Sequence, residues 1–114
     1  MKRLLLLSLI VCSVMQVQAQ DLKNIQLPAP NTKRGLPVMT ALEKRQSTRE
    51  FAARNLELQD LSDLIWAAVG VNRQNQGKRT APTALNRQEI DLYVIMSDGA
   101  YLYEAKKHVL IPVA

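Results

Sequence analysis

The hydrophobic pattern of this chain changes period once, from helical spacing before residue 70 to strand spacing after residue 90. Apolar side chains in residues 58–69 recur at three- and four-residue intervals, which places them on one helix face. Residues 90–96 form a β-branched and aromatic run that is apolar on both faces beyond Asp91, as in an interior strand. Helices followed by strands predict an α+β fold.

The longer expected helix, residues 58–69, has one apolar stripe, formed by Leu58, Leu61, Leu64, Ile65 and Ala68. Gly70 is placed to end it as a left-handed residue. Trp66 lies in the last turn, where it either packs in the core or forms the wall of a ligand pocket.

A shorter helix is expected over residues 39–45. Thr40 and Glu43 have capping-box spacing, although Pro37 could equally be the first helical residue. Two apolar side chains would face inward, those of Met39 and Leu42.

The dipeptide Asp98-Gly99 indicates a two-residue hairpin turn, with residues 100–103 as the returning strand. Another apolar stretch starts at Val109. So few elements bury little surface, because small chains are marginally stable alone. We therefore expect either a second chain to cover the strands or the sequence to be the first part of a longer protein.

The first residues have the pattern of a secretory signal peptide, predicted over residues 1–19. A basic start precedes an apolar run from Leu4 to Met15, and Val17-Gln18-Ala19 supplies small residues for cleavage. The alternatives are a buried or anchoring helix, or a lipoprotein modified at Cys12. After cleavage no stable membrane span is expected, and the protein would be exported, to the periplasm or the medium.

Residues 20–37 are expected to form an extended arm, because prolines and Gly35 make regular structure unlikely. The arm is either a disordered tether or a segment that wraps a partner subunit. The net charge of +5 carries little weight as a sign of nucleic-acid binding, because the signal contributes Lys2 and Arg3 and export removes that partner. No nucleic-acid partner is expected.

Arg45, Ser47 and Arg49 alternate after the short helix and could converge on one oxyanion, although a solvated charged turn is the alternative. Residues 79–86 form a second polar segment whose small residues would let backbone N–H groups approach a flat ligand. No nucleophile–base pair or metal site is evident, and His108 is expected to be a satisfied surface or core histidine. If the chain is an enzyme, a bound cofactor carries the chemistry.

Residues 42–51 resemble the opening signature of the nitroreductase superfamily, of the form Arg-x-Ser-x-Arg-x-Phe. Further segments resemble the SagB-type dehydrogenase branch of that superfamily, in order along the chain: 61–73, 79–84, 88–94 and 98–103. The resemblance covers roughly residues 38–110. It implies that residues 38–114 are the N-terminal part of a nitroreductase-like domain, truncated at the C-terminus, with helices packed on a mixed or antiparallel sheet.

The resemblance also implies an FMN-dependent homodimer with the flavin at the subunit interface. Arg45 and Arg49 would serve the flavin phosphate and ring edge, and Ser47 would hydrogen-bond nearby. The loop that reaches the flavin held mainly by the other subunit would comprise Pro82, Thr83, Ala84 and Asn86. A structure that placed the groups of Arg45, Ser47 and Arg49 in bulk water, away from the Pro82 loop, would contradict the oxidoreductase interpretation.

The implied activity is hydride transfer through flavin N5 between a donor and a small-molecule substrate or acceptor, with no side chain as general acid or base. Because nicotinamide donors are scarce outside the cytosol, a dehydrogenase is expected rather than a nicotinamide-driven nitro reductase. The alternative is an exported non-catalytic binding module or a degenerate fragment of such an enzyme.

Overall fold

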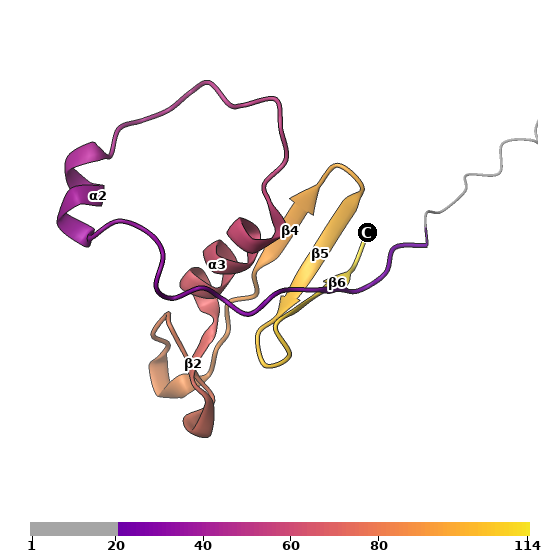
Figure 1. Cartoon of the computed structure of the whole chain (residues 1–114). Helices are drawn as coiled ribbons and strands as arrows, with labels where there is room; N and C mark the ends of the chain where they lie inside the picture. Colours follow the sequence, from indigo (N-terminus) through magenta and orange to yellow (C-terminus); the bar gives the residue numbers. More distant parts are fainter. Residues whose placement is uncertain (1–20) are drawn as a thin grey trace, which may run out of the picture.

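The computed structural model describes residues 21–114 and has an α+β architecture, as the sequence predicts (Figure 1). The helices are α2 (Val38–Lys44) and α3 (Leu58–Val69). One antiparallel sheet has the strand order β1 (Ile25–Gln26), β6 (Val109–Pro112), β5 (Gly99–Glu104) and β4 (Tyr93–Met96). The predicted signal peptide lies outside the described residues. No helix of residues 21–114 combines the length and apolar character that a membrane crossing requires.

The hairpin β4–β5 forms where the sequence predicts it, but its turn is shifted by one residue. Met96 pairs with Gly99, so the two-residue loop is Ser97-Asp98 rather than Asp98-Gly99. The Tyr101 hydroxyl donates a 2.9 Å hydrogen bond to the Asp98 carboxylate. This contact links the turn to β5.

The expectation that regular structure is unlikely in residues 20–37 was wrong for β1. Ile25 and Gln26 pair with Leu110 and Val109, which makes β1 an edge strand of the chain's own sheet. Leu27, directly after it, is buried in the core. The segment therefore crosses from the sheet to α3, and residues 25–35 are called the strap below (Figure 1).

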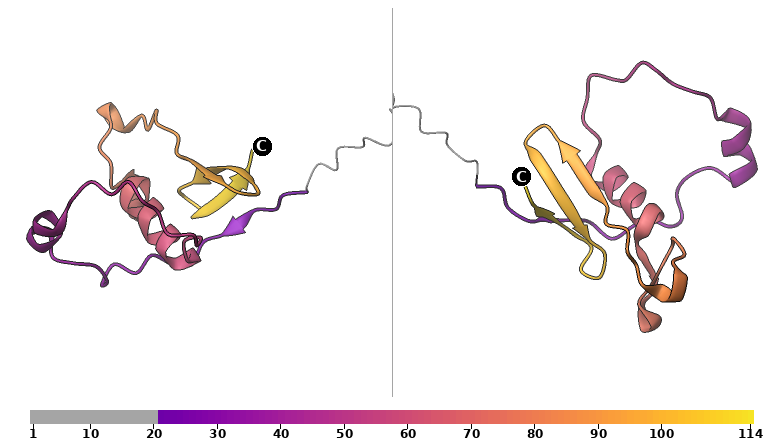
Figure 2. Two further views of the ribbon diagram at one scale, coloured as in Figure 1. Left: turned by 90° about the horizontal axis from the view of Figure 1, so that it is seen from above. Right: turned by 180° about the vertical axis from the view of Figure 1, so that it is seen from behind.

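The core lies between α3 and one face of the sheet (Figure 2). Its buried side chains are those of Leu27, Ile65, Val71, Tyr101, Tyr103, Ala105 and Leu110. Only part of the predicted α3 stripe reaches it: Ile65 is buried and Leu61 packs beside it, whereas Leu64 is 60% exposed.

The expectation that β4 is an interior strand does not hold for the described residues. Val94 and Met96 pack against the core, but Ile95 on the other face is 76% exposed. β4 forms one edge of the sheet. The apolar pattern on both faces is real, but the chain covers only one of them.

Helix α2 forms one residue earlier than predicted, and its packing was mispredicted. The Pro37 carbonyl accepts the first helical hydrogen bond, from Ala41 at 2.9 Å, so Thr40 lies inside the helix and does not cap it. Met39 is 76% exposed and Leu42 is 59% exposed, rather than inward. Figures 1 and 2 show the reason: α2 and its flanking segments project away from the sheet.

Gly70 ends α3 for a different reason from the predicted one. Its backbone is extended, with φ −66° and ψ 156°, and not left-handed. A Cβ at this position would come within 2.6 Å of Cγ of Trp66. Gly70 is therefore required for space against the Trp66 ring, not for backbone freedom.

After α3 the chain forms a small two-stranded hairpin, β2 (Val71–Arg73) and β3 (Lys78–Arg79). The connection is the short helix η1 (Gln74–Gln76), followed by Gly77 at φ +60°. A further turn, η2 (Ala84–Asn86), leads towards β4. The sequence predicts a polar segment over residues 79–86 and gives no signal for the hairpin, whose strands are only three and two residues long.

Candidate functional site

An open groove of about 370 Å³ lies between the β2–β3 hairpin and the η2 turn. It is lined by Arg73, Lys78, Arg79, Ala81, Pro82, Thr83, Leu85 and Asn86. Three of the four predicted loop residues therefore share one cavity, and Ala84 lies outside its lining. The basic residues of this groove are not evident from the sequence, because their convergence depends on the hairpin.

The groove carries positive charge without a balancing carboxylate. Within residues 21–114 the ion pairs all belong to Arg34, so no carboxylate lies within 4.0 Å of the three basic groups. Arg73 donates from Nη2 to the Arg79 carbonyl at 2.9 Å and from Nε to Asn72 at 3.2 Å. Nε of Arg79 is buried and has no hydrogen-bond partner among the described residues. Such a groove favours an anion.

Gln88 holds the two walls of the groove together. Its side-chain amide donates to the Gly77 carbonyl at 2.7 Å on the hairpin and to Asn86 Oδ1 at 3.0 Å on the η2 wall. Its backbone N–H donates to the Thr83 hydroxyl oxygen at 3.1 Å. The groove is thus a cross-linked structure rather than two independent loops.

The η2 wall has strained backbone. The backbone φ is positive at Leu85, Asn86 and Gln88, with values of 53°, 54° and 56°. Residues other than glycine rarely adopt this left-handed region. Leu85 is also 84% exposed, so burial of its side chain does not offset the strain. Backbone strain of this kind concentrates at functional sites.

The structure does not bring the predicted anion-binding turn to the groove within one chain. Arg45, Ser47 and Arg49 are all exposed, on the segment that projects with α2 (Figure 2). None of the three side chains has a hydrogen bond or ion pair within the part of the chain that the structure describes. Their convergence on one anion stays a prediction, and in this single chain they face water.

A buried serine, Ser62, lies beside His108, although the two residues are far apart in the sequence. Ser62 Oγ lies 2.7 Å from Nε2 of His108, and the Tyr103 hydroxyl lies 2.8 Å from Nδ1. The Pro28 carbonyl lies 3.0 Å from Nε2 and 2.5 Å from Ser62 Oγ. His108 therefore joins α3, β5 and the strap, and it is a satisfied histidine as the sequence predicts.

One proton arrangement satisfies all of these groups. Tyr103 donates to Nδ1, Nε2–H donates towards Pro28 and Ser62, and the Ser62 hydroxyl donates to the Pro28 carbonyl. Nε2 then carries a proton and cannot act as a base towards Ser62, which is 0% exposed. The pair is structural and is not a nucleophile with its base. Burial raises the pKa of Tyr103 to about 12.

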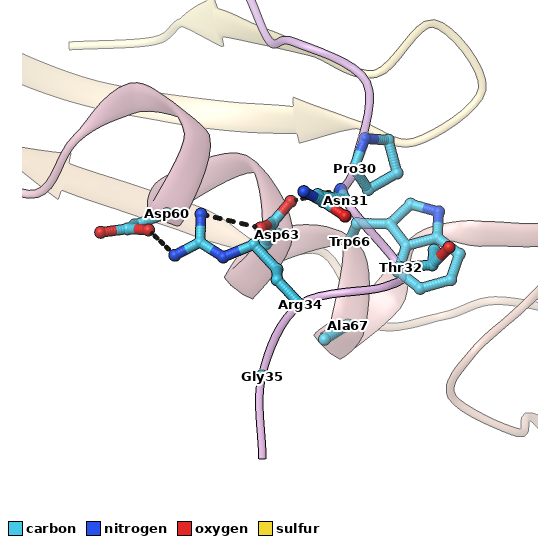
Figure 3. Close-up of a pocket in the computed structure, with 9 residues that line it drawn as sticks. All are labelled: Pro30, Asn31, Thr32, Arg34, Gly35, Asp60, Asp63, Trp66 and Ala67. Atoms are coloured by element: carbon cyan, nitrogen blue, oxygen red, sulfur yellow. Dashed lines mark hydrogen bonds and ion pairs between the residues drawn. The ribbon is translucent and has the colours of Figure 1, made fainter. Parts of the chain in front are cut away.

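The strap makes a second attachment to α3, drawn in Figure 3. Arg34 forms ion pairs with Asp60 and Asp63, and the Asn31 backbone N–H donates to Asp63 at 2.7 Å. This backbone hydrogen bond is the main reason that the pKa of Asp63 is lowered. Trp66, in the last turn of α3, lines a cavity of about 470 Å³ beside these groups and is not part of the buried core, so it forms a cavity wall.

Within residues 21–114, no three His, Cys, Asp or Glu side chains gather where they could hold a metal ion. The chemistry of the groove is that of cations, a hydroxyl and an amide.

The described residues thus form an α+β domain in which one helix packs on an antiparallel sheet beside a cationic groove. The Nitroreductase family model matches residues 42–114. The chain therefore belongs to the nitroreductase family.

Two relatives agree with this assignment. The chain is 29% identical over 103 residues to "Putative nitroreductase MJ1384" of Methanocaldococcus jannaschii, covering 85% of this chain and 46% of the relative. It is also similar to the crystal structure of a protein described as a putative nitroreductase from Ralstonia eutropha JMP134. That match has a TM-score of 0.75 and 44% identity, and covers 80% of this chain and 43% of the other. The chain thus spans a little under half the length of these relatives.

Proposed function

We propose that this chain is part of an FMN-dependent oxidoreductase, of the SagB-type dehydrogenase branch of the nitroreductase family. Family membership supports an oxidoreductase, and flavin is the family's usual cofactor. The observation that carries the proposal is the groove between β2–β3 and η2, where Pro82, Thr83 and Asn86 meet three basic side chains.

The residues present suit a flavin nucleotide. Guanidinium groups and a hydroxyl are the donors that bind phosphate best, and Arg45, Ser47 and Arg49 offer both, exposed and without competing partners in the described chain. The loop beside the groove has small side chains at Ala81, Pro82 and Ala84, which permit close backbone approach. When bound, FMN would supply hydride transfer through N5. The chain's own residues would hold the nucleotide, supply positive charge and exclude water.

We propose a homodimer with the flavin at its interface. Support comes from large apolar side chains left uncovered between residues 36 and 58, namely Leu36, Val38, Met39, Leu42, Phe51, Leu56 and Leu58. Exposed apolar patches of this extent mark interaction surfaces. Pairing would cover them and could carry the Arg45–Arg49 turn to the partner's groove. Sedimentation of the Phe51→Glu variant should show a weaker dimer, and an unchanged dimer contradicts this interface.

We also propose export, with cleavage after residue 19 by a signal peptidase. Intact-mass measurement of the protein from a secreting host tests this directly. Because nicotinamide donors are scarce outside the cytosol, the exported enzyme would oxidise another small molecule. Rapid turnover of NADPH with no other donor would contradict that preference.

The test of the cofactor is the colour of the purified chain. A yellow preparation with flavin absorbance, or uptake of added FMN, supports the oxidoreductase. A preparation that stays colourless with added FMN favours the alternative, a non-catalytic binding module or degenerate fragment.

A further inference from the structure

The groove between the β2–β3 hairpin and η2 has more positive charge than the proposed flavin contacts use. We propose that Arg73 and Lys78 form an anion subsite there, which selects small-molecule substrates carrying a carboxylate or phosphate group. This inference rests on the proposed function and names the substrate class of the same site.

The charges are available to a ligand. Both side chains line the groove, both residues are exposed, and neither has an ion pair within residues 21–114. Arg73 is held in place by its two hydrogen bonds, to the Arg79 carbonyl and to Asn72, which leave its other N–H groups free. A positioned guanidinium loses less side-chain entropy on binding than a free one.

The site is built rather than accidental. The hairpin that carries Arg73 and Lys78 is joined to the η2 wall through Gln88, which bonds both Gly77 and Asn86. Arg79 lines the same groove and adds a third positive charge, and its Nε is buried without a hydrogen-bond partner among the described residues. The strained residues Leu85 and Asn86 form the opposite wall. Three cations without a carboxylate partner in residues 21–114, held on a cross-linked wall, favour an anionic ligand.

The substrate is favoured over the cofactor as the source of the anion. Arg45 and Arg49 are already proposed for the flavin phosphate, which they would reach from the partner chain of the proposed dimer, so Arg73 and Lys78 are left for another anionic group. Pro82 and Thr83, which would meet the flavin, line the same groove as Arg73 and Lys78. A ligand held by the basic pair would therefore lie next to the flavin.

The experiment compares two pairs of ligands that each differ by one anionic group. Binding of 4-nitrobenzoate and of neutral 4-nitrobenzyl alcohol to the flavin-loaded chain is measured by calorimetry, and binding of FMN and of riboflavin to the apoprotein is measured by fluorescence. The variants are Arg73→Gln and Lys78→Gln. Lys107→Gln, an exposed lysine in the β5–β6 turn, is the matched control.

We expect the protein to prefer the acid to the alcohol. Each variant should weaken the binding of 4-nitrobenzoate by about tenfold, the effect of one charge-assisted hydrogen bond. The affinity for the alcohol and the ratio of FMN affinity to riboflavin affinity should not change. Lys107→Gln should change nothing. If the variants instead reduce the preference for FMN over riboflavin, the groove serves the cofactor phosphate and the proposal is overturned.

Failure of the proposed function is distinguishable. A protein that takes up no flavin contradicts the oxidoreductase, and the calorimetric comparison on the flavin-free chain then decides the anion subsite alone. If the wild-type protein, with or without flavin, binds 4-nitrobenzoate and 4-nitrobenzyl alcohol with equal affinity, the proposal of an anion subsite is overturned.

Discussion

The Ser62 hydroxyl donates a 2.5 Å hydrogen bond to the carbonyl oxygen of Pro28. This contact joins α3 to the strap across 34 residues of sequence, at a position where Ser62 is fully buried. His108 reaches the same carbonyl at 3.0 Å, so three distant segments meet at one backbone oxygen. The strap is therefore fixed by polar contacts as well as by Leu27 in the core.

Replacing Ser62 by alanine should lower the free energy of unfolding by about 1–2 kcal/mol, because a buried hydrogen bond is lost while the Pro28 carbonyl keeps only His108. Urea denaturation followed by Trp66 fluorescence measures it. Ser47→Ala, at an exposed position, is the matched control and should leave stability unchanged. Equal stability of the two variants would show that the Ser62 contact contributes nothing.

The second attachment of the strap should weaken in acid. The pKa of Asp63 is lowered below its ordinary 3.8, chiefly by the Asn31 N–H, so the folded state binds its proton less readily than the unfolded state. The stability that this contributes is present above pH 3.8 and is lost as the pH falls through the depressed pKa. The protection factor of the Asn31 amide, its intrinsic hydrogen-exchange rate divided by its observed rate, should fall in that range. Asp63→Asn should remove the pH dependence, and its persistence in that variant would contradict the assignment.

Tyr103 should contribute to alkaline unfolding. Burial raises its pKa to about 12 from an ordinary 10.0, so its contribution to stability is present below pH 10.0 and is lost as the pH rises through about 12. Absorbance at the tyrosinate band during a pH titration should show late-titrating tyrosines; Tyr103→Phe should remove the one near pH 12, while Tyr101, whose pKa burial also raises, remains. A wild-type titration complete near pH 10 would contradict burial of this hydroxyl.

Gly70→Ala should lower the free energy of unfolding by about 1–3 kcal/mol through overpacking, because the added Cβ meets the Trp66 ring. Gly77→Ala is the control: it meets no atom within 4 Å but sits at φ +60°, so its cost is backbone strain of about 1 kcal/mol. Trp66→Ala should partly rescue the first variant and not the second. A double-mutant cycle with no coupling between residues 66 and 70 would rule out the ring as the cause.

Arg45→Ala and Arg49→Ala should each weaken FMN retention by about tenfold or more, the loss of a charge-assisted hydrogen bond to an anion. The control is Arg54→Ala, because Arg54 is an exposed arginine on the same segment; this variant should leave FMN retention unchanged. Flavin fluorescence during dialysis measures retention. Unchanged retention in both variants would refute the assignment of this turn to the flavin.

The local sequence pattern was enough to predict the elements whose residues interact with others only a few positions away in the chain. Helix α3 has the predicted bounds, α2 and the β4–β5 turn are displaced by one residue, and β4 is shorter than expected. These elements could be predicted because helical spacing, turn residues and β-branched runs act over short distances. The fold class followed from the same short-range signals, whereas the family was expected from the resemblance of residues 42–51 and the later segments to its signature.

Long-range contacts decided the rest. The sequence could not show that β1 would join β6, that His108 would reach Ser62, or that Arg73, Lys78 and Pro82 would line one groove. It also misassigned Gly70, whose role depends on the Trp66 ring, and Met39, which lacks a partner surface in this chain. Periodicity states which face of an element is apolar. Only the packed chain determines what, if anything, covers that face, because burial is a property of the whole set of neighbours.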